Sequence, residues 1–132
     1  MDRRTVRRSL VISIVIGVGG FGGAIARYGT ELLVGGTLLS TFLVNVIGSF
    51  LLGLVVYDAL EAPGVDSRTR LLFGTGFLSS FTTYSTFIAD VIAVPEFAIA
   101  YVGASYAIGF GAVVLARILI DPGSVVLREA DP

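Results

Sequence analysis

The segment from Gly74 to Phe87 combines glycine with serine and threonine hydroxyls in an otherwise apolar stretch. These hydroxyls compete for backbone hydrogen bonds, so the composition favours a local break in a helix. A break near Ser79 to Thr82 would free carbonyl oxygens, which are hard ligands suited to a small cation such as Na⁺. The alternative is an intact helix whose hydroxyls donate to carbonyls of the preceding turn.

Two aromatic residues end this segment. Tyr84 and Phe87 are three residues apart and would share one face of a helix. Because an aromatic ring has a positive edge, two rings presented edge-on could favour a small anion without the tight hold of a full charge. Ordinary aromatic packing explains the same spacing.

Two polar residues in other apolar segments are candidates for the same chemistry. Asn45 is the only asparagine in the chain, and its amide can donate two hydrogen bonds to an anion. Ser105 is a weaker candidate of the same kind. Either side chain could instead join neighbouring helices.

The elements that would position these residues are membrane-spanning helices. The chain has 132 residues, of which 55% are hydrophobic and 14% charged, whereas soluble domains carry roughly 25% charged residues. A helix crosses a bilayer with about 20 apolar residues. Four such stretches run from about Leu10 to Ala26, Leu38 to Val56, Leu71 to Val94 and Phe97 to Leu119.

We therefore expect a single integral membrane domain over residues 1–132. It would be an all-α bundle of four transmembrane helices, with the third helix broken and a polar tail over residues 121–132. Gly19 and Gly23 on the first helix would let backbones approach closely. The ridge of Gly103, Ala107 and Gly111 would do the same on the fourth.

The composition excludes several functions. Cysteine, histidine and lysine are all absent, which removes disulfides, imidazole or thiolate metal sites, Cys/His nucleophile pairs and Schiff-base lysines. We therefore expect no enzyme. No basic stripe suited to nucleic acid is present either.

Arginines predict the orientation of the chain, because cytoplasmic flanks of spans are enriched in Lys and Arg. With four spans, both termini and the loop between the second and third spans share one side of the membrane. That side holds every arginine except Arg27. We expect both termini in the cytoplasm and the protein in the cell membrane, surrounded by lipid.

The sequence resembles the Fluc/CrcB family of fluoride channels over about Gly17 to Ile120. The resemblance rests on the stretch from Gly19 to Tyr28, on the Asn45-Val-Ile-Gly-Ser-Phe element, and above all on the stretch from Gly76 to Phe87. It implies an antiparallel dimer that exports fluoride passively and so lowers fluoride toxicity. It also implies a structural Na⁺ at the two-fold axis.

Carried over by position, the resemblance implies a fluoride pathway and a sodium site. The backbone carbonyls of Ser79 and Thr82 would bind Na⁺. The chain departs from the family pattern at Ser79-Ser80, where Gly-Gly is common, at Tyr84, where a phenylalanine stands, and at Gly109, where a second serine stands. The residues implied for the pathway are Asn45, Tyr84, Phe87 and Ser105, with the hydroxyls of Thr83, Ser85 and Thr86.

The uneven arginines bear on the dimer. A single sequence that inserts in both directions should have nearly balanced flanks, whereas this one has eight arginines against one. The hypothesis is that the chain pairs with a homologous subunit of opposite orientation.

Two other functions fit the size of the chain. A small four-helix multidrug exporter would need a carboxylate in the first span, and none lies between Leu10 and Ala26. A noncatalytic structural membrane subunit fits the composition but leaves Asn45 and the hydroxyl segment unexplained.

Overall fold

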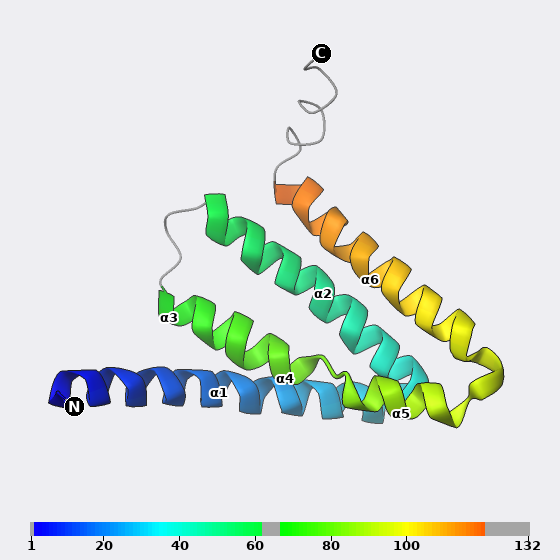
Figure 1. Ribbon diagram of the computed structural model, residues 1–132, viewed down its shortest axis with the longest axis horizontal. Helices are drawn as coiled ribbons and strands as arrows, with labels where there is room; N and C mark the ends of the chain where they lie inside the picture. Colours follow the sequence, from blue (N-terminus) through cyan, green and yellow to red (C-terminus); the bar gives the residue numbers. More distant parts are fainter. Residues whose placement is uncertain (1, 62–66, 121–132) are drawn as a thin grey trace, which may run out of the picture.

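The computed structural model describes residues 2–61 and 67–120, and within these ranges the regular structure is entirely helical (Figure 1). The predicted all-α class is therefore confirmed for the described chain. The predicted polar tail, residues 121–132, lies outside the described residues. The helices in chain order are α1 (Arg3–Val34), α2 (Thr37–Glu61), α3 (Ser67–Arg70), η1 (Leu71–Leu78), α4 (Ser79–Phe81), α5 (Ser85–Ala93), η2 (Pro95–Phe97) and α6 (Ala98–Ile120).

Three helical segments of the described chain are long and apolar enough to cross a membrane. They are Arg3–Val34, Thr37–Tyr57 and Pro95–Ile120. Their outer surfaces carry exposed apolar side chains, including Phe21, Leu33 and Ile99. In water such surfaces would be costly, whereas in lipid they are the expected exterior.

The segment expected as a third span is divided among shorter helices. α3 runs into η1, a π-helix, and α4 follows directly. π-helices are rare and mostly short, so eight consecutive residues in this form are unusual. α4 ends at Phe81 and α5 begins at Ser85, which leaves Thr82, Thr83 and Tyr84 as a non-helical link.

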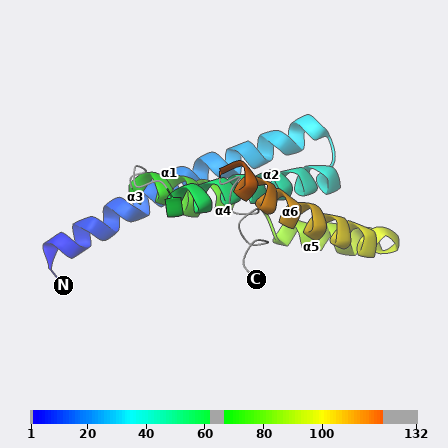
Figure 2. The same cartoon turned by 90° about the horizontal axis from the view of Figure 1, so that it is seen from above.

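The helices pack in two pairs. α1 lies along η1 and α4, and α2 lies along α6 (Figure 1). The view turned by 90° shows that α5 and the start of α6 project to one side of α1 (Figure 2). α2 contacts both pairs, so it holds the α6 side of the molecule to the interrupted segment.

Close approach between α1 and η1 requires glycine at three positions. A Cβ at Gly19 would overlap the Leu72 carbonyl, and one at Gly23 would overlap the Phe77 carbonyl. A Cβ at Gly76 would lie 2.6 Å from the Ile16 carbonyl oxygen. These three glycines therefore bring the backbones of α1 and η1 into direct contact, as small residues do between membrane helices.

On α6, the helix predicted as the fourth span, one small residue packs against α2 and the others face outward. Ala116 is fully buried and packs against Gly53 of α2. Gly103 and Gly111 have no neighbouring atoms within 4 Å of a built Cβ, and Ala107 between them is exposed. The ridge of Gly103, Ala107 and Gly111 thus faces away from the described chain.

Candidate functional site

The non-helical link is held by a two-bond contact with α2. Asn45 Nδ2 donates to the Thr83 carbonyl oxygen at 2.9 Å, and the Thr83 backbone N–H donates to Asn45 Oδ1 at 2.8 Å. Buried backbone groups must find partners when a helix stops. The Asn45 side chain satisfies both backbone groups of Thr83. Its amide therefore takes the place of the hydrogen bonds that a continuous helix would make there.

The Thr83 side chain then starts the next helix. Its Oγ1 accepts a hydrogen bond from the Thr86 backbone N–H at 3.2 Å and donates to Thr86 Oγ1 at 2.9 Å. The bond spans three residues, as a capping bond does, although Thr83 precedes the N-cap residue of α5, Tyr84. Thr83, the central residue of the link, is buried at 7% exposure, as polar backbone at membrane depth must be.

These two contacts leave two carbonyl oxygens without their helical donors. In an α-helix the Ser79 carbonyl would accept from Thr83 N–H, and the Thr82 carbonyl from Thr86 N–H. Both donors instead bind side chains, Asn45 Oδ1 and Thr83 Oγ1. The Ser79 and Thr82 carbonyl oxygens therefore lack their α-helical donors, and carbonyl oxygens are the kind of ligand that a hard cation such as Na⁺ takes.

The predicted alternative, hydroxyls that bond back along the helix, also occurs. Thr82 Oγ1 donates to the Leu78 carbonyl at 2.9 Å. Ser79 Oγ donates to the Thr75 carbonyl and, at 3.1 Å, to the Gly76 carbonyl. Ser79 itself is helical, so the link lies at Thr82 to Tyr84, C-terminal to most of the predicted break.

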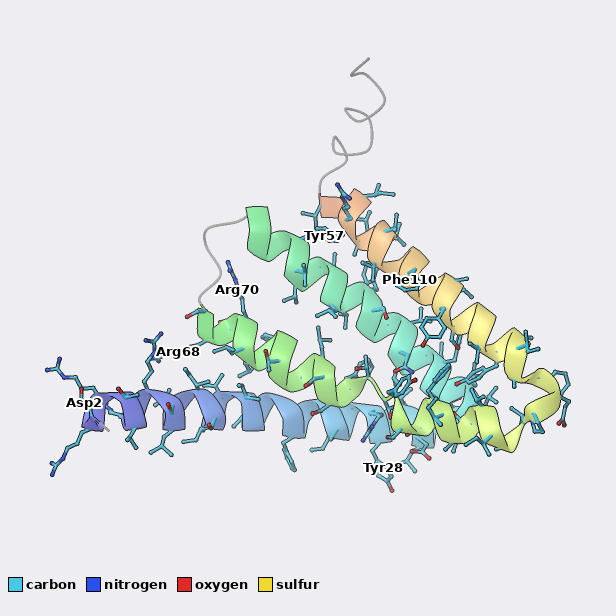
Figure 3. All side chains as sticks on the ribbon, viewed as in Figure 1. Asp2, Tyr28, Tyr57, Arg68, Arg70 and Phe110 are labelled. Atoms are coloured by element: carbon cyan, nitrogen blue, oxygen red, sulfur yellow. The ribbon has the colours of Figure 1, made fainter. Side chains whose placement is uncertain are left out.

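A cavity of about 230 Å³, here called the aromatic cavity, lies between α2, α5 and α6. Four of the residues that the resemblance implies for the fluoride pathway line this cavity together. They come from α2, the non-helical link, α5 and α6. Its walls also include Phe110, whose α6 position is labelled in Figure 3. The four are Asn45, Tyr84, Phe87 and Ser105.

Phe87 packs against three other rings, of which Tyr84 and Tyr106 also line the aromatic cavity. Phe87 is 6% exposed, and its ring lies 5.3 Å from Tyr101 and 6.1 Å from Tyr84, centroid to centroid. Tyr106 meets Phe87 at 6.1 Å with an interplanar angle of 87°, an edge-to-face arrangement. Such packing fixes the orientation of the Phe87 ring and hence the direction of its positive edge.

The polar groups of the aromatic cavity are neutral. Asn45 Nδ2 uses one hydrogen for Thr83 and retains a second. The Ser105 hydroxyl is buried and has no hydrogen-bond partner in the described chain. Among the described residues, those lining this cavity include no Asp, Glu or Arg. A group that enters it therefore meets donors and rings without a fixed charge.

The remaining predicted residues lie around the link. Thr83 and Thr86 line a second cavity of about 160 Å³ with Arg27 and Glu31. Ser79 and Thr82 line a third, of about 340 Å³, which shares Asn45 and Tyr84 with the aromatic cavity. Ser85 lines none of the three, although its Oγ lies 3.4 Å from Thr83 Oγ1.

Sequence reasoning missed some lining residues. Ser49 lies one turn after Asn45 on α2 and lines both the aromatic and the third cavity. Tyr106 of α6 also lines the aromatic cavity. Tyr101 lines none of the three cavities, but its ring packs against Phe87 and its hydroxyl donates to the Leu38 carbonyl at 3.3 Å. The spacing of Ser49 from Asn45 could have identified it, because residues four apart share a helix face.

The fold and the cavities define a helical membrane protein with an uncharged, partly aromatic polar site. Residues 14–117 match the family model described as CrcB-like protein, Camphor Resistance (CrcB). That match covers most of the chain. The chain belongs to the CrcB family, as the resemblance of its motifs predicted.

Three relatives are similar over most of their lengths. A protein of Haloarcula marismortui is 48% identical over 104 residues, 79% of this chain and 81% of the relative. One of Natronomonas pharaonis is 48% identical over 111 residues, 83% of this chain and 92% of the relative. Both are named fluoride-specific ion channel FluC 1. A Halobacterium salinarum protein named FluC 2 is 39% identical over 105 residues.

The names of these relatives describe ion channels, which are transport proteins and not enzymes. Together with the three apolar helices, the family makes this chain a membrane protein.

Proposed function

We propose that the chain is one subunit of a fluoride channel in the cytoplasmic membrane. It would let fluoride leave the cell down its own gradient and so lower fluoride toxicity. The observation that carries this proposal is the aromatic cavity, where Asn45, Ser105 and the Phe87 ring meet without a charged residue. The names of the 48% identical relatives support the same ion.

The chemistry of the aromatic cavity suits rapid passage of a small anion. Conduction needs sites strong enough to replace hydration but weak enough to release the ion. A buried arginine would hold fluoride tightly. The free Asn45 N–H, the unpartnered Ser105 hydroxyl and the ring edge of Phe87 offer weaker, neutral contacts instead.

A dimer is supported by the surface of α6 and by the openness of the site. The ridge of Gly103, Ala107 and Gly111 faces away from the chain. Tyr84 is 69% exposed although it lines the aromatic cavity. A second subunit would cover these features, and in the proposed assembly the two subunits are antiparallel, with four spans in each.

Sodium would be held by main-chain atoms of the link. The carbonyls of Ser79 and Thr82 have lost their helical donors to Asn45 and Thr83 side chains. Bound there, Na⁺ would neutralise the exposed carbonyl dipoles and stabilise the contact between subunits. Because the ligands are main-chain oxygens, the serine at position 79 is compatible with this site.

The distribution of arginines supports an orientation of the chain in the membrane and a kind of partner subunit. The start of α1 and the labelled Arg68 and Arg70 lie toward the same end of the molecule in Figure 3, away from the labelled Tyr28. Arg117 lies at the matching end of α6, over the Tyr57 ring. We infer that this end is cytoplasmic and that the antiparallel partner is a homologous subunit of opposite bias.

Two alternatives are weaker. A multidrug exporter would need a proton-binding carboxylate in its first span. This chain has no Asp or Glu between Leu10 and Ala26. A noncatalytic structural subunit leaves the buried, unpartnered Ser105 hydroxyl without a purpose.

The proposal is tested in bacterial cells that lack any fluoride exporter. Cells producing this chain, with a homologous partner if one is required, should grow at fluoride concentrations that stop the parent strain. Their internal fluoride, measured with an electrode after lysis, should be lower. Equal growth and equal internal fluoride, with the protein present in the membrane, would count against the proposal.

A further inference from the structure

Ser49 on α2 lies where two cavities meet. It lines the aromatic cavity together with Asn45, Phe87 and Ser105, and it lines the third cavity with Ser79 and Thr82. Asn45, Ser49 and Tyr84 are common to both cavities. The Ser49 side chain therefore borders both spaces.

The Ser49 hydroxyl is uncommitted within the described part of the chain. In membrane helices serine and threonine often donate to the carbonyl four residues earlier. Thr30 and Thr82 make that bond, to Ala26 and Leu78, and Ser40 donates to Thr37. Ser49 makes no such bond. In this it resembles Ser105, the other serine of the aromatic cavity, whose hydroxyl also has no partner.

The wall opposite Ser49 has no side chain. Gly109 is one turn beyond Ser105 on α6, and it also lines the aromatic cavity. A Cβ built at Gly109 would lie 3.7 Å from Ser49 Oγ and would meet no other atom within 4 Å. A hydroxyl on residue 109 would therefore be close to the space that the Ser49 hydroxyl occupies.

We propose that Ser49 supplies the second serine hydroxyl of the aromatic cavity, taking the place of a hydroxyl that Gly109 cannot provide. It would donate to a fluoride ion next to Ser105 and Asn45, on the path toward the third cavity. The inference rests on the proposed function, because it assigns a role within that pathway. It concerns a residue that sequence reasoning did not select.

The test uses fluoride efflux from liposomes containing the full chain, with its partner subunit where one is needed. Ser49→Ala should lower the fluoride flux about 3- to 10-fold, because one neutral hydrogen bond is lost. Adding Gly109→Ser to Ser49→Ala should restore most of the flux, since the built Cβ has ordinary contact distance and the hydroxyl returns to the same space. Gly109→Ala in the same background adds bulk without a hydroxyl and should not restore the flux; restoration by alanine would show a packing role alone and overturn the inference.

Ser13→Ala is the matched control, because Ser13 is exposed on α1 and lines none of the three cavities. It should leave the flux unchanged. Normal flux in Ser49→Ala, or a loss that Gly109→Ser does not recover, would overturn the inference. Absence of fluoride flux in the unmodified protein would instead contradict the proposed function, so the two failures are distinguishable.

Discussion

Asn45 and Thr83 form a closed pair across 38 residues of chain, with the amide of one binding both backbone groups of the other. The pair joins the middle of α2 to the point where the helical segment of residues 71–93 is interrupted. The Asn45 side chain therefore has two roles. It stabilises the non-helical link, and it lines the aromatic cavity with one amide N–H left over.

Asn45→Leu should destabilise the link. The substitution leaves the N–H and carbonyl of Thr83, a residue only 7% exposed, without partners. We expect a loss of about 1–3 kcal/mol for each group left unsatisfied. Thermal unfolding of the detergent-solubilised protein measures this effect. Unchanged thermal stability would show that the two bonds do not hold the link.

Phe87→Ile should lower fluoride flux while leaving assembly intact. The isoleucine keeps apolar bulk but removes the ring edge, and a loss of about 1.4 kcal/mol corresponds to about tenfold in rate. Phe21→Ile is the matched control, because Phe21 is 72% exposed on α1 and lines none of the three cavities. Equal flux in both variants would remove Phe87 from the pathway.

Gly23→Ala should weaken the contact between α1 and η1. The added methyl would overlap the Phe77 carbonyl, and such overpacking costs about 1–3 kcal/mol. Gly29→Ala, where a Cβ would meet nothing within 4 Å, should be neutral or slightly stabilising. Thermal unfolding of the two variants compares them directly. The packing account fails if Gly23→Ala is as stable as Gly29→Ala.

Removal of Na⁺ should lower the dimer content and the fluoride flux, whereas removal of the Ser79 side chain should change neither. Because the proposed ligands are carbonyl oxygens, Ser79→Ala should keep the same sodium dependence as the unmodified protein. Replacing Na⁺ by a large organic cation should reduce dimer content, measured by cross-linking, and fluoride flux together. Dimer content and flux that are indifferent to Na⁺ would rule out the proposed cation site.

The arginine distribution predicts a fixed orientation. A reporter active only in the cytoplasm should be active when fused to the C-terminus of this chain. The same reporter fused to a homologous subunit with opposite arginine bias should be inactive. The protein can also be purified from cells that make this chain alone. If it forms an antiparallel homodimer that conducts fluoride, the proposal of a separate partner subunit is contradicted.

The helical class was predictable because apolar composition leaves few other structures for a membrane segment. The interruption was expected near Ser79 to Thr82, whereas the non-helical residues are Thr82 to Tyr84. The difference arises because Asn45 takes the Thr83 N–H. The break thus coincides with a contact from a side chain on a distant helix, and no local sequence pattern records that contact.

Ser49 illustrates a second limit. Its residue type is that of Ser40, which donates back to its own helix, and its spacing of four from Asn45 indicates only a shared helix face. Only the three-dimensional arrangement shows Ser49 opposite Gly109 and between two cavities. Asn45 was easier to select, because an amide in an apolar stretch is rare and costly whatever its partner.

Selective efflux from liposomes tests most directly whether neutral donors and ring edges replace the water around a small halide. Liposomes containing the purified assembly are loaded with fluoride or with chloride, and efflux is recorded with an ion-selective electrode. We predict rapid fluoride release and chloride release no faster than from protein-free liposomes. Equal release of the two ions, or no fluoride release from a correctly assembled protein, would contradict the account.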